Sequence, residues 1–288
     1  MKIGKYNLNK HTPSSLYHRH IRPLWDERLR GKSAWQRRFL VLTNNFCNLS
    51  CWSCSALCNK PIGSNPFRQE KYITPLSNIE RFLELIKDYR PKYWIRLSGG
   101  EVTLCPVNHV EHIADLSHLY GRNISLLTNG ANMLGIDPHL FEFIHLDEHI
   151  LNEKLIYQVA DYFKSVGYKR YQILTTKVHR DLNIQRRGHV TEGLNCSAMM
   201  QAISLWRDTI YPCCVLPFLD GWNGNTKIRD SLLKAGWSIF NDDLVDTMDN
   251  YKDTLPEDAV YACTNQCWHN GPNKVYEPVS NPLRRIPI

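Results

Sequence analysis

The stretch Cys47-Asn-Leu-Ser-Cys51-Trp-Ser-Cys54 places three cysteines at C-x3-C-x2-C spacing. It comes shortly after the run Phe39-Leu-Val-Leu-Thr43, which has the length and apolar character of a buried strand. Three thiolates on one loop can hold three irons of a 4Fe-4S cluster and leave the fourth iron open. A structural zinc site needs a fourth ligand, which Cys58 could supply, and a redox dithiol needs only two cysteines. The spacing alone favours the cluster and leaves a closed zinc site as the alternative.

A second motif follows about fifty residues later. The strand-like run Tyr93-Trp-Ile-Arg-Leu97 ends in Ser98-Gly99-Gly100-Glu101. Two glycines allow the backbone to approach a ligand closely, and a glutamate offers a carboxylate to an ammonium group. Taken by itself a Gly-Gly-Glu is common, so its meaning comes from its place at a strand end after the cysteine loop.

Together the two motifs resemble the signature of the radical S-adenosylmethionine (radical SAM) enzymes. The resemblance implies that Cys47, Cys51 and Cys54 hold a 4Fe-4S cluster whose open iron is chelated by the methionine part of S-adenosylmethionine (AdoMet), and that Glu101 binds the AdoMet amino group. Ser53 departs from the family pattern, which has an aromatic residue there, and Trp52 is the candidate to take its place near adenine. The residues assigned to AdoMet in this way are Trp52, Ser98, Gly99, Gly100, Glu101 and Asn129, the last from a Thr-Asn-Gly turn like that of the family's third strand.

Strand-like and helical segments alternate along the middle of the chain with short links. The expected helices cover 75–89, 110–120 and 153–166, and the expected strands cover 39–43, 93–97, 123–127, 141–146 and 171–177. Such alternation is typical of parallel β/α units. The fold class is therefore α/β, and the resemblance implies a partial (β/α)6 TIM-type barrel over residues 39–190.

In a barrel of this kind, active-site groups lie at the carboxyl ends of the strands. This rule nominates Asp147, His149 and Lys177 for contacts with the substrate. The alternative for each of them is an ordinary solvated residue at the edge of a loop.

The C-terminal region, residues 191–288, contains a further group of cysteines. Two short strands around residues 207–209 predict a hairpin that brings Cys196 near Cys213, and a C-x3-C pair follows at Cys263 and Cys267. Four thiolates can close a second 4Fe-4S site, and the arrangement resembles the Twitch and SPASM extensions of radical SAM enzymes. The sequence leaves open whether Cys213 or Cys214 is the ligand, and a zinc site or buried thiols remain the alternative.

The positive charge of the chain is concentrated in an N-terminal arm, residues 1–38. The arm contains ten Lys or Arg residues against Asp26 and Glu27, a net of +8, whereas the whole chain carries +7, so the remainder carries −1. A basic arm with aromatic residues is a candidate contact for nucleic acid, and the alternative is a solvated extension. The arginines nominated for DNA contact are Arg28, Arg30, Arg37 and Arg38.

These features predict an enzyme that cleaves AdoMet to a 5′-deoxyadenosyl radical and takes a hydrogen from a substrate carbon. The resemblance also implies two 4Fe-4S clusters and an electron donor such as flavodoxin or ferredoxin. Some bacteriophage members of the superfamily rearrange amino-acid adducts on thymine in DNA, by isomerase-type chemistry, and the basic chain is compatible with them. A peptide maturase is the alternative substrate class, and a zinc-stabilised nucleic-acid-binding protein is the alternative without catalysis. Ten cysteines without a signal peptide or a membrane-length apolar run predict a reducing cytoplasm, that of the host if the protein is viral.

Overall fold

The computed structural model divides the chain into two compact units, residues 1–35 and 36–288. The residues that it describes are 2–3, 6–7, 38–51, 54, 56, 58, 70–89, 93–149, 152–175, 203–211, 214, 217, 236–241, 243–244 and 284–285. In the first unit they form two short antiparallel strands, β1 (Lys2–Ile3) and β2 (Tyr6–Asn7). The expected contacts of Arg28, Arg30 and Arg37 lie outside the described residues.

The second unit is built on an eight-stranded sheet with the order β11-β10-β9-β3-β5-β6-β7-β8. Its strands are β3 (Arg38–Leu42), β5 (Trp94–Ser98), β6 (Ile124–Thr128), β7 (Phe143–Glu148), β8 (Tyr171–Thr175), β9 (Ile203–Trp206), β10 (Thr209–Tyr211) and β11 (Trp237–Ser238). All neighbours from β9 through β3 to β8 are parallel, and β10 and β11 add antiparallel pairs at one edge. The parallel α/β fold that the sequence predicts is confirmed.

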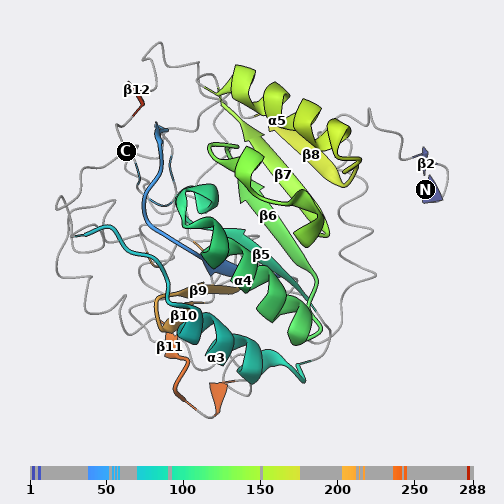
Figure 1. Ribbon diagram of the computed structural model, residues 1–288. Helices are drawn as coiled ribbons and strands as arrows, with labels where there is room; N and C mark the ends of the chain where they lie inside the picture. Colours follow the sequence, from blue (N-terminus) through green and yellow to red (C-terminus); the bar gives the residue numbers. More distant parts are fainter. Residues whose placement is uncertain are drawn as a thin grey trace. The chain divides into compact units, whose positions relative to one another are not determined.

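Three α-helices connect the parallel strands. They are α3 (Leu76–Ile86) between β3 and β5, α4 (Val107–Leu119) between β5 and β6, and α5 (Glu153–Ser165) between β7 and β8. Short 3-10 turns, η3 (Val102–Leu104), η4 (Met133–Gly135) and η5 (Pro138–Leu140), occupy the loops around them. Because β3, β5, β6, β7 and β8 are neighbours in chain order, right-handed crossovers place the connecting helices on one face of the sheet. Figure 1 shows α3 and α4 in front of the sheet and α5 along its β7–β8 edge.

The core lies between this face and the helices. Alternate residues of each strand point to opposite faces, and those on the helix side are apolar and fully buried, including Phe39 of β3 and Ile95 of β5. Phe39 meets Phe82 of α3 edge to face, with ring centroids 5.4 Å apart. Burying one such side chain contributes roughly 1.5–3 kcal/mol, so the alternation fixes which face of each strand carries the core. The opposite face is more polar and presents Arg96, Ser125 and His145.

The C-terminal end of α3 is closed by a buried arginine. The guanidinium of Arg122 donates to the carbonyl oxygens of Ile86, Lys87 and Tyr89, at 3.1 Å for Tyr89 and 3.4 Å for Lys87. The last carbonyls of a helix have no partner within the helix, so a cation placed there supplies hydrogen bonds and favourable charge.

The predicted hairpin is present as β9 and β10, with Trp206 paired to Thr209 across the turn Arg207-Asp208. A two-residue turn of this kind requires positive φ, and Arg207 adopts φ +61°. The guanidinium of Arg207 lies 4.5 Å from the centroid of the Tyr72 ring, a favourable contact for a residue held in a strained conformation. The first strand of the hairpin pairs in parallel with β3, so the hairpin extends the barrel sheet itself.

Two further short strands form a separate antiparallel pair, β4 (Leu49–Ser50) in the cysteine loop and β12 (Arg284–Arg285) near the C-terminus. In the described part of the chain, no helix combines the length and apolar character needed to cross a bilayer.

Candidate functional site

The cysteine loop and the Gly-Gly-Glu motif are joined by a seam of backbone hydrogen bonds. Thr43 N donates to Ser98 O at 2.8 Å, Gly100 N donates to Asn44 O at 2.9 Å, and Glu101 N donates to Phe46 O at 2.8 Å. The seam continues the pairing of β3 with β5 past the ends of both strands. The two motifs are therefore one structural unit, although about fifty residues separate them in the sequence.

Both glycines of the motif are required by this seam. A Cβ on Gly100 would lie 2.1 Å from Phe46 O, and a Cβ on Gly99 would lie 2.6 Å from Asn44 O. Gly99 also has φ +125°, a conformation that residues with a side chain rarely adopt. The sequence predicts close approach of the backbone to a ligand, and the close approach that the structure shows is to the chain's own cysteine loop.

Two asparagines between β3 and the cysteines hold the seam from the side. The Asn44 amide donates to Glu101 O at 2.7 Å and to the Cys105 sulfur at 3.1 Å. Asn45 exchanges hydrogen bonds with the returning chain, accepting from Tyr72 N at 2.9 Å through its side-chain oxygen. The sequence marks these asparagines only as the end of a strand, and their role depends on partners that are distant along the chain.

The described cysteines of the loop are thiols, with no disulfide among the described residues. The Cys47 sulfur accepts from Leu49 N and from the Asn129 amide, each at 3.3 Å, and the Cys54 sulfur accepts from Cys58 N at 3.2 Å. Burial, and then the charge of Glu101, raise the pKa of Cys47 to about 12. Burial, and then Cys54 and Cys47, raise the pKa of Cys51. A thiol that is protonated for these reasons is deprotonated when a metal binds, because the metal supplies the missing positive charge.

The donor set of the loop fits an iron-sulfur cluster. Among the described residues, no three His, Cys, Asp or Glu side chains converge on a point that could hold one ion. A cubane cluster needs no such convergence, because each thiolate binds a different iron. The loop supplies three thiols with N–H donors directed at two of their sulfurs, and such donors are a common way to stabilise cluster thiolates.

Cys58 and Cys105 differ from the three loop cysteines. Both side chains are buried: the Cys58 thiol contacts Asn45 O at 3.5 Å, and Cys105 accepts from Asn44. Their hydrogen bonds lie within the fold of the loop, which agrees with a structural role for the two residues.

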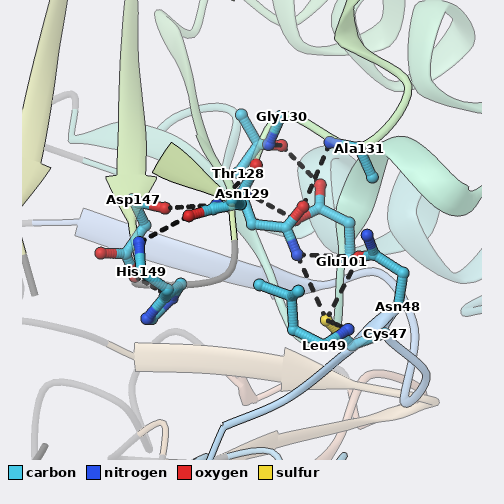
Figure 2. Close-up of polar contacts among 11 residues, drawn as sticks. Cys47, Asn48, Leu49, Glu101, Thr128, Asn129, Gly130, Ala131, Asp147 and His149 are labelled. Atoms are coloured by element: carbon cyan, nitrogen blue, oxygen red, sulfur yellow. Dashed lines mark hydrogen bonds and ion pairs between the residues drawn. The ribbon is translucent and has the colours of Figure 1, made fainter. Parts of the chain in front are cut away.

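The carboxylate of Glu101 is the most fully hydrogen-bonded group of the site. Figure 2 shows its contacts with Thr128 and Asn129. Its Oε1 accepts from Thr103 N at 3.0 Å, Thr103 Oγ1 at 2.7 Å and Thr128 Oγ1 at 2.5 Å, while Oε2 accepts from Asn129 N at 2.6 Å. Burial raises the pKa of Glu101, and these hydrogen bonds oppose the shift by stabilising the charged form. The carboxylate thus connects the end of β5 to the end of β6 by hydrogen bonds. Its Oε2 atom can accept a further hydrogen bond.

Asn129 connects this carboxylate to the cysteine loop, as Figure 2 shows. Its backbone N–H donates to Glu101, and its side-chain amide donates to the Cys47 sulfur and, at 2.9 Å, to the Asn48 oxygen. The structure thereby brings together Cys47, Glu101 and Asn129, three residues that the sequence assigns to one site.

The carboxyl end of β7 is held to this group by a residue that the sequence analysis did not select. The Asn152 amide donates to Asn129 O at 2.9 Å and to Asp147 O at 3.0 Å, and its oxygen accepts from His149 N at 2.6 Å. His149 Nε2 lies 3.4 Å from Asp147 Oδ2, a contact that becomes an ion pair when the imidazole is protonated. Both residues lie at a strand end (Figure 2). Asn152 orients the backbone that carries them. No local sequence pattern marks Asn152 for this role, because its partner Asn129 is distant in the chain.

Several predicted site residues fall outside the described residues, and Arg38 occupies a different place from the one expected. The positions outside the description are Trp52, Lys177, Cys196, Cys213, Cys263 and Cys267. Cys214 is described as a partly exposed thiol. Arg38, grouped with the arm in the sequence analysis, is the first residue of β3 and belongs to the sheet.

Comparisons with known proteins agree with this arrangement at the level of the fold. No family model and no curated protein sequence matches the chain. The crystal structure of BtrN in complex with AdoMet and 2-DOIA matches with a TM-score of 0.52 and 14% identity over 78% of this chain and 88% of BtrN. BtrN is a radical SAM enzyme. The chain has the radical SAM fold.

Two other radical SAM enzymes are similar more weakly. Streptococcus suis SuiB bound to S-adenosylmethionine matches with a TM-score of 0.41 and 13% identity, over 91% of this chain and 80% of SuiB. Native anSMEcpe with bound AdoMet matches with a TM-score of 0.37 and 16% identity, over 47% of this chain and 42% of that one.

Proposed function

We propose that this protein is a radical SAM enzyme that binds a 4Fe-4S cluster through Cys47, Cys51 and Cys54 and cleaves AdoMet. The observation that carries the proposal is the contact of Asn129 with both the Cys47 sulfur and the Glu101 carboxylate at the carboxyl end of the parallel strands. In folds of this kind that edge of the sheet is where catalysis takes place. The chemistry that the cluster supplies when bound is one-electron reductive cleavage of AdoMet to methionine and a 5′-deoxyadenosyl radical.

The residues of the chain position the cofactor. Glu101 Oε2, which accepts one described hydrogen bond, is available to the AdoMet ammonium group, and the other oxygen is already held by three donors. A carboxylate that is fixed before the ligand arrives loses little freedom on binding, so more of the charge-assisted interaction appears as affinity. The Asn129 amide, 3.3 Å from the Cys47 sulfur, fixes the orientation of the first cluster ligand.

The first test of this function is the variant Glu101→Gln. One end of the glutamine amide would present an N–H group either to Asn129 N or to the donors now held by Oε1, so one donor would face another. We expect AdoMet affinity to fall at least tenfold, which corresponds to about 1.4 kcal/mol, because a charge-assisted hydrogen bond is lost and the site is distorted. AdoMet binding and the release of 5′-deoxyadenosine by the anaerobically reconstituted, reduced protein measure this effect.

The matched control is Glu153→Gln, which removes the same charge from the exposed first turn of α5. It should leave AdoMet affinity unchanged. An unaltered affinity in Glu101→Gln would remove Glu101 from the cofactor site.

For the C-terminal region we propose the auxiliary 4Fe-4S cluster, held by Cys196, Cys213 (or Cys214), Cys263 and Cys267. The described β9–β10 hairpin supports this proposal, because the strand β10 ends at Tyr211, two residues before Cys213. The chain would then hold two clusters, and an electron donor such as flavodoxin or ferredoxin would reduce the one at the AdoMet site.

For the substrate we propose an amino-acid-modified thymine in DNA, rearranged by isomerase-type chemistry, with a peptide as the competing substrate. The support is the net charge of +8 on residues 1–38 beside a nearly neutral remainder. Phosphate contacts made by lysine and arginine release counterions, so the affinity falls as the salt concentration rises.

The test of this substrate is the salt dependence of DNA binding. Duplex affinity should fall with a slope of about −0.9 per phosphate contact in a plot of log affinity against log salt. Replacing Arg28, Arg30 and Arg37 with glutamine should flatten the slope and leave iron content unchanged. Arg38 is left intact because it belongs to β3. Equal DNA affinity of wild type and variant at low salt would favour the peptide.

A further inference from the structure

On the face of the sheet opposite the helices, three polar residues form a cluster in the middle of neighbouring strands. The side chain of Arg96 on β5 contacts Ser125 of the neighbouring strand β6 and His145 of β7, with its Nη2 3.3 Å from His145 Nδ1 and its Nε 3.4 Å from Ser125 Oγ. In the sheet register, Arg96 is paired with Ser125, and His145 is paired with Leu127, two residues further along β6. Because all three residues lie within strands, the hydrogen bonds of the sheet fix the position of the cluster.

The cluster carries the positive charge of Arg96. Burial, and then the charge of Arg38, lower the pKa of Arg96 to about 9, so the guanidinium is charged at neutral pH. Burial, and then the charges of Arg96 and Arg38, lower the pKa of His145 to about 4, whereas Asp147 acts in the opposite direction. The Arg96 guanidinium is therefore charged in a partly buried region, and the imidazole of His145 beside it is neutral.

No carboxylate forms an ion pair with Arg96 in the part of the chain that the structure describes. Asp147, on the same strand as His145, is paired with His149 at the strand end. A largely buried guanidinium without a counter-charge costs free energy, so an anion bound beside it would stabilise the fold.

The hydrogen-bonding capacity of the cluster also suits an anion. Arg96 has only N–H donors, so His145 Nδ1 accepts and the ring proton lies on Nε2. Ser125 Oγ is engaged by Arg96 and by Ile95 O, which leaves guanidinium and imidazole N–H groups as the remaining donors. A pair of N–H donors on a planar cation is well matched to a carboxylate or a phosphate.

We propose that Arg96 and His145 bind an oxyanion of the substrate, a carboxylate or a phosphate group, on the sheet face opposite the helices. Arg96 precedes Ser98 by two residues on the same face, so this site lies about 7 Å below the strand end where AdoMet is proposed to bind. The assignment to the substrate rests on the proposed function. The presence of an oxyanion site at Arg96 does not.

The test is calorimetric titration of the reconstituted protein, with and without AdoMet, using inorganic phosphate and acetate at constant ionic strength. We expect wild type to bind one of these anions saturably, and Arg96→Gln to bind it at least tenfold more weakly. Arg170→Gln, which removes an arginine exposed just before β8, should match wild type. A preference for phosphate indicates a phosphoryl group in the substrate, and a preference for acetate indicates a carboxylate.

Three results would overturn the proposal. They are the absence of saturable binding of either anion by wild type, equal weakening in Arg96→Gln and Arg170→Gln, and a loss of AdoMet affinity in Arg96→Gln as large as the loss for the anion. The last result would assign the cluster to the carboxylate of AdoMet itself. If the reconstituted wild-type protein binds the anion but does not cleave AdoMet, the proposed function is refuted and the oxyanion site is retained.

A second measurement uses only the wild-type protein, in case Arg96→Gln does not fold. A bound anion stabilises the charged imidazolium, so phosphate or acetate should raise the pKa of His145. The ring-nitrogen shifts of 15N-histidine-labelled protein, with His145 assigned through His145→Gln, report this change. A His145 titration that is the same with and without either anion would refute binding at this site.

Discussion

Replacing Cys47, Cys51 and Cys54 together with alanine is expected to abolish AdoMet cleavage and to remove one of two clusters. With two 4Fe-4S clusters, the reconstituted protein should contain about eight irons per chain and the triple variant about four. Cys58 is not expected to replace the missing ligands, because its side chain is buried. Among the described cysteines of the loop, only Cys47, Cys51 and Cys54 have partly exposed side chains. Iron and sulfide analysis after anaerobic reconstitution, with release of 5′-deoxyadenosine, measures both effects.

The control for this variant is Cys105→Ser, which keeps a hydrogen-bond acceptor for the Asn44 amide and touches none of the three loop thiols. It should retain all of the iron and the AdoMet cleavage. Stoichiometric zinc without iron in the anaerobically purified wild type would contradict the cluster and return a zinc-stabilised binding protein to consideration. Retention of all of the iron by the triple variant would show that other residues hold the cluster.

Much of the parallel sheet could be predicted from the sequence because its signals are local. The run at 39–43 and the strand before Gly99 have strand composition, and the helices at 75–89 and 153–166 have helical periodicity. The junction of the Gly-Gly-Glu with the cysteine loop also follows once both are placed at the ends of neighbouring parallel strands, because such ends meet at one edge of a sheet.

The sequence does not reveal strand pairings and hydrogen bonds between residues that are distant in the chain. The pairing of β9 with β3 joins residues more than one hundred and fifty positions apart, and no periodicity within β9 selects that neighbour. Asn44 and Asn152 are ordinary loop-edge residues until the carbonyls and the carboxylate-bearing strand that they bind are in place. Their hydrogen bonds depend on tertiary structure alone.

The Arg96–His145 cluster lies between these cases. Both residues stand between two apolar neighbours of a strand, Arg96 between Ile95 and Leu97 and His145 between Ile144 and Leu146. Period-two alternation places each of them on the face away from its buried neighbours, so a shared polar face was available from the sequence. Their direct contact was not, because it depends on the stagger between β5 and β7 across β6.

The variant Gly100→Ala tests the seam itself, and we expect it to prevent the site from forming. The added Cβ would lie 2.1 Å from Phe46 O, 2.5 Å from Asn44 Oδ1 and 2.7 Å from Phe46 C. Two of these three atoms are backbone, so no side-chain rotation relieves the overlap and the cysteine loop must move away from the strand end. Overpacking of this kind costs about 3 kcal/mol or more, and the displaced loop loses the hydrogen bond from Glu101 N to Phe46 O.

Gly135→Ala is the matched control, because a Cβ there meets no atom within 4 Å, and Gly135 is not among the glycines with positive φ. We expect Gly135→Ala to match wild type in thermal unfolding midpoint and in iron content. Gly100→Ala should unfold at a lower temperature and lose the cluster bound by Cys47, Cys51 and Cys54, whereas a cluster held by the C-terminal cysteines should remain. If the second cluster is present, Gly100→Ala and the triple cysteine variant should each retain about four irons per chain. Equal iron content in the two variants would indicate that both have lost the cluster at Cys47, Cys51 and Cys54. Equal stability and equal iron in Gly100→Ala and Gly135→Ala would mean that the loop does not lie against the Gly-Gly-Glu motif, and the site built on that contact would have to be abandoned.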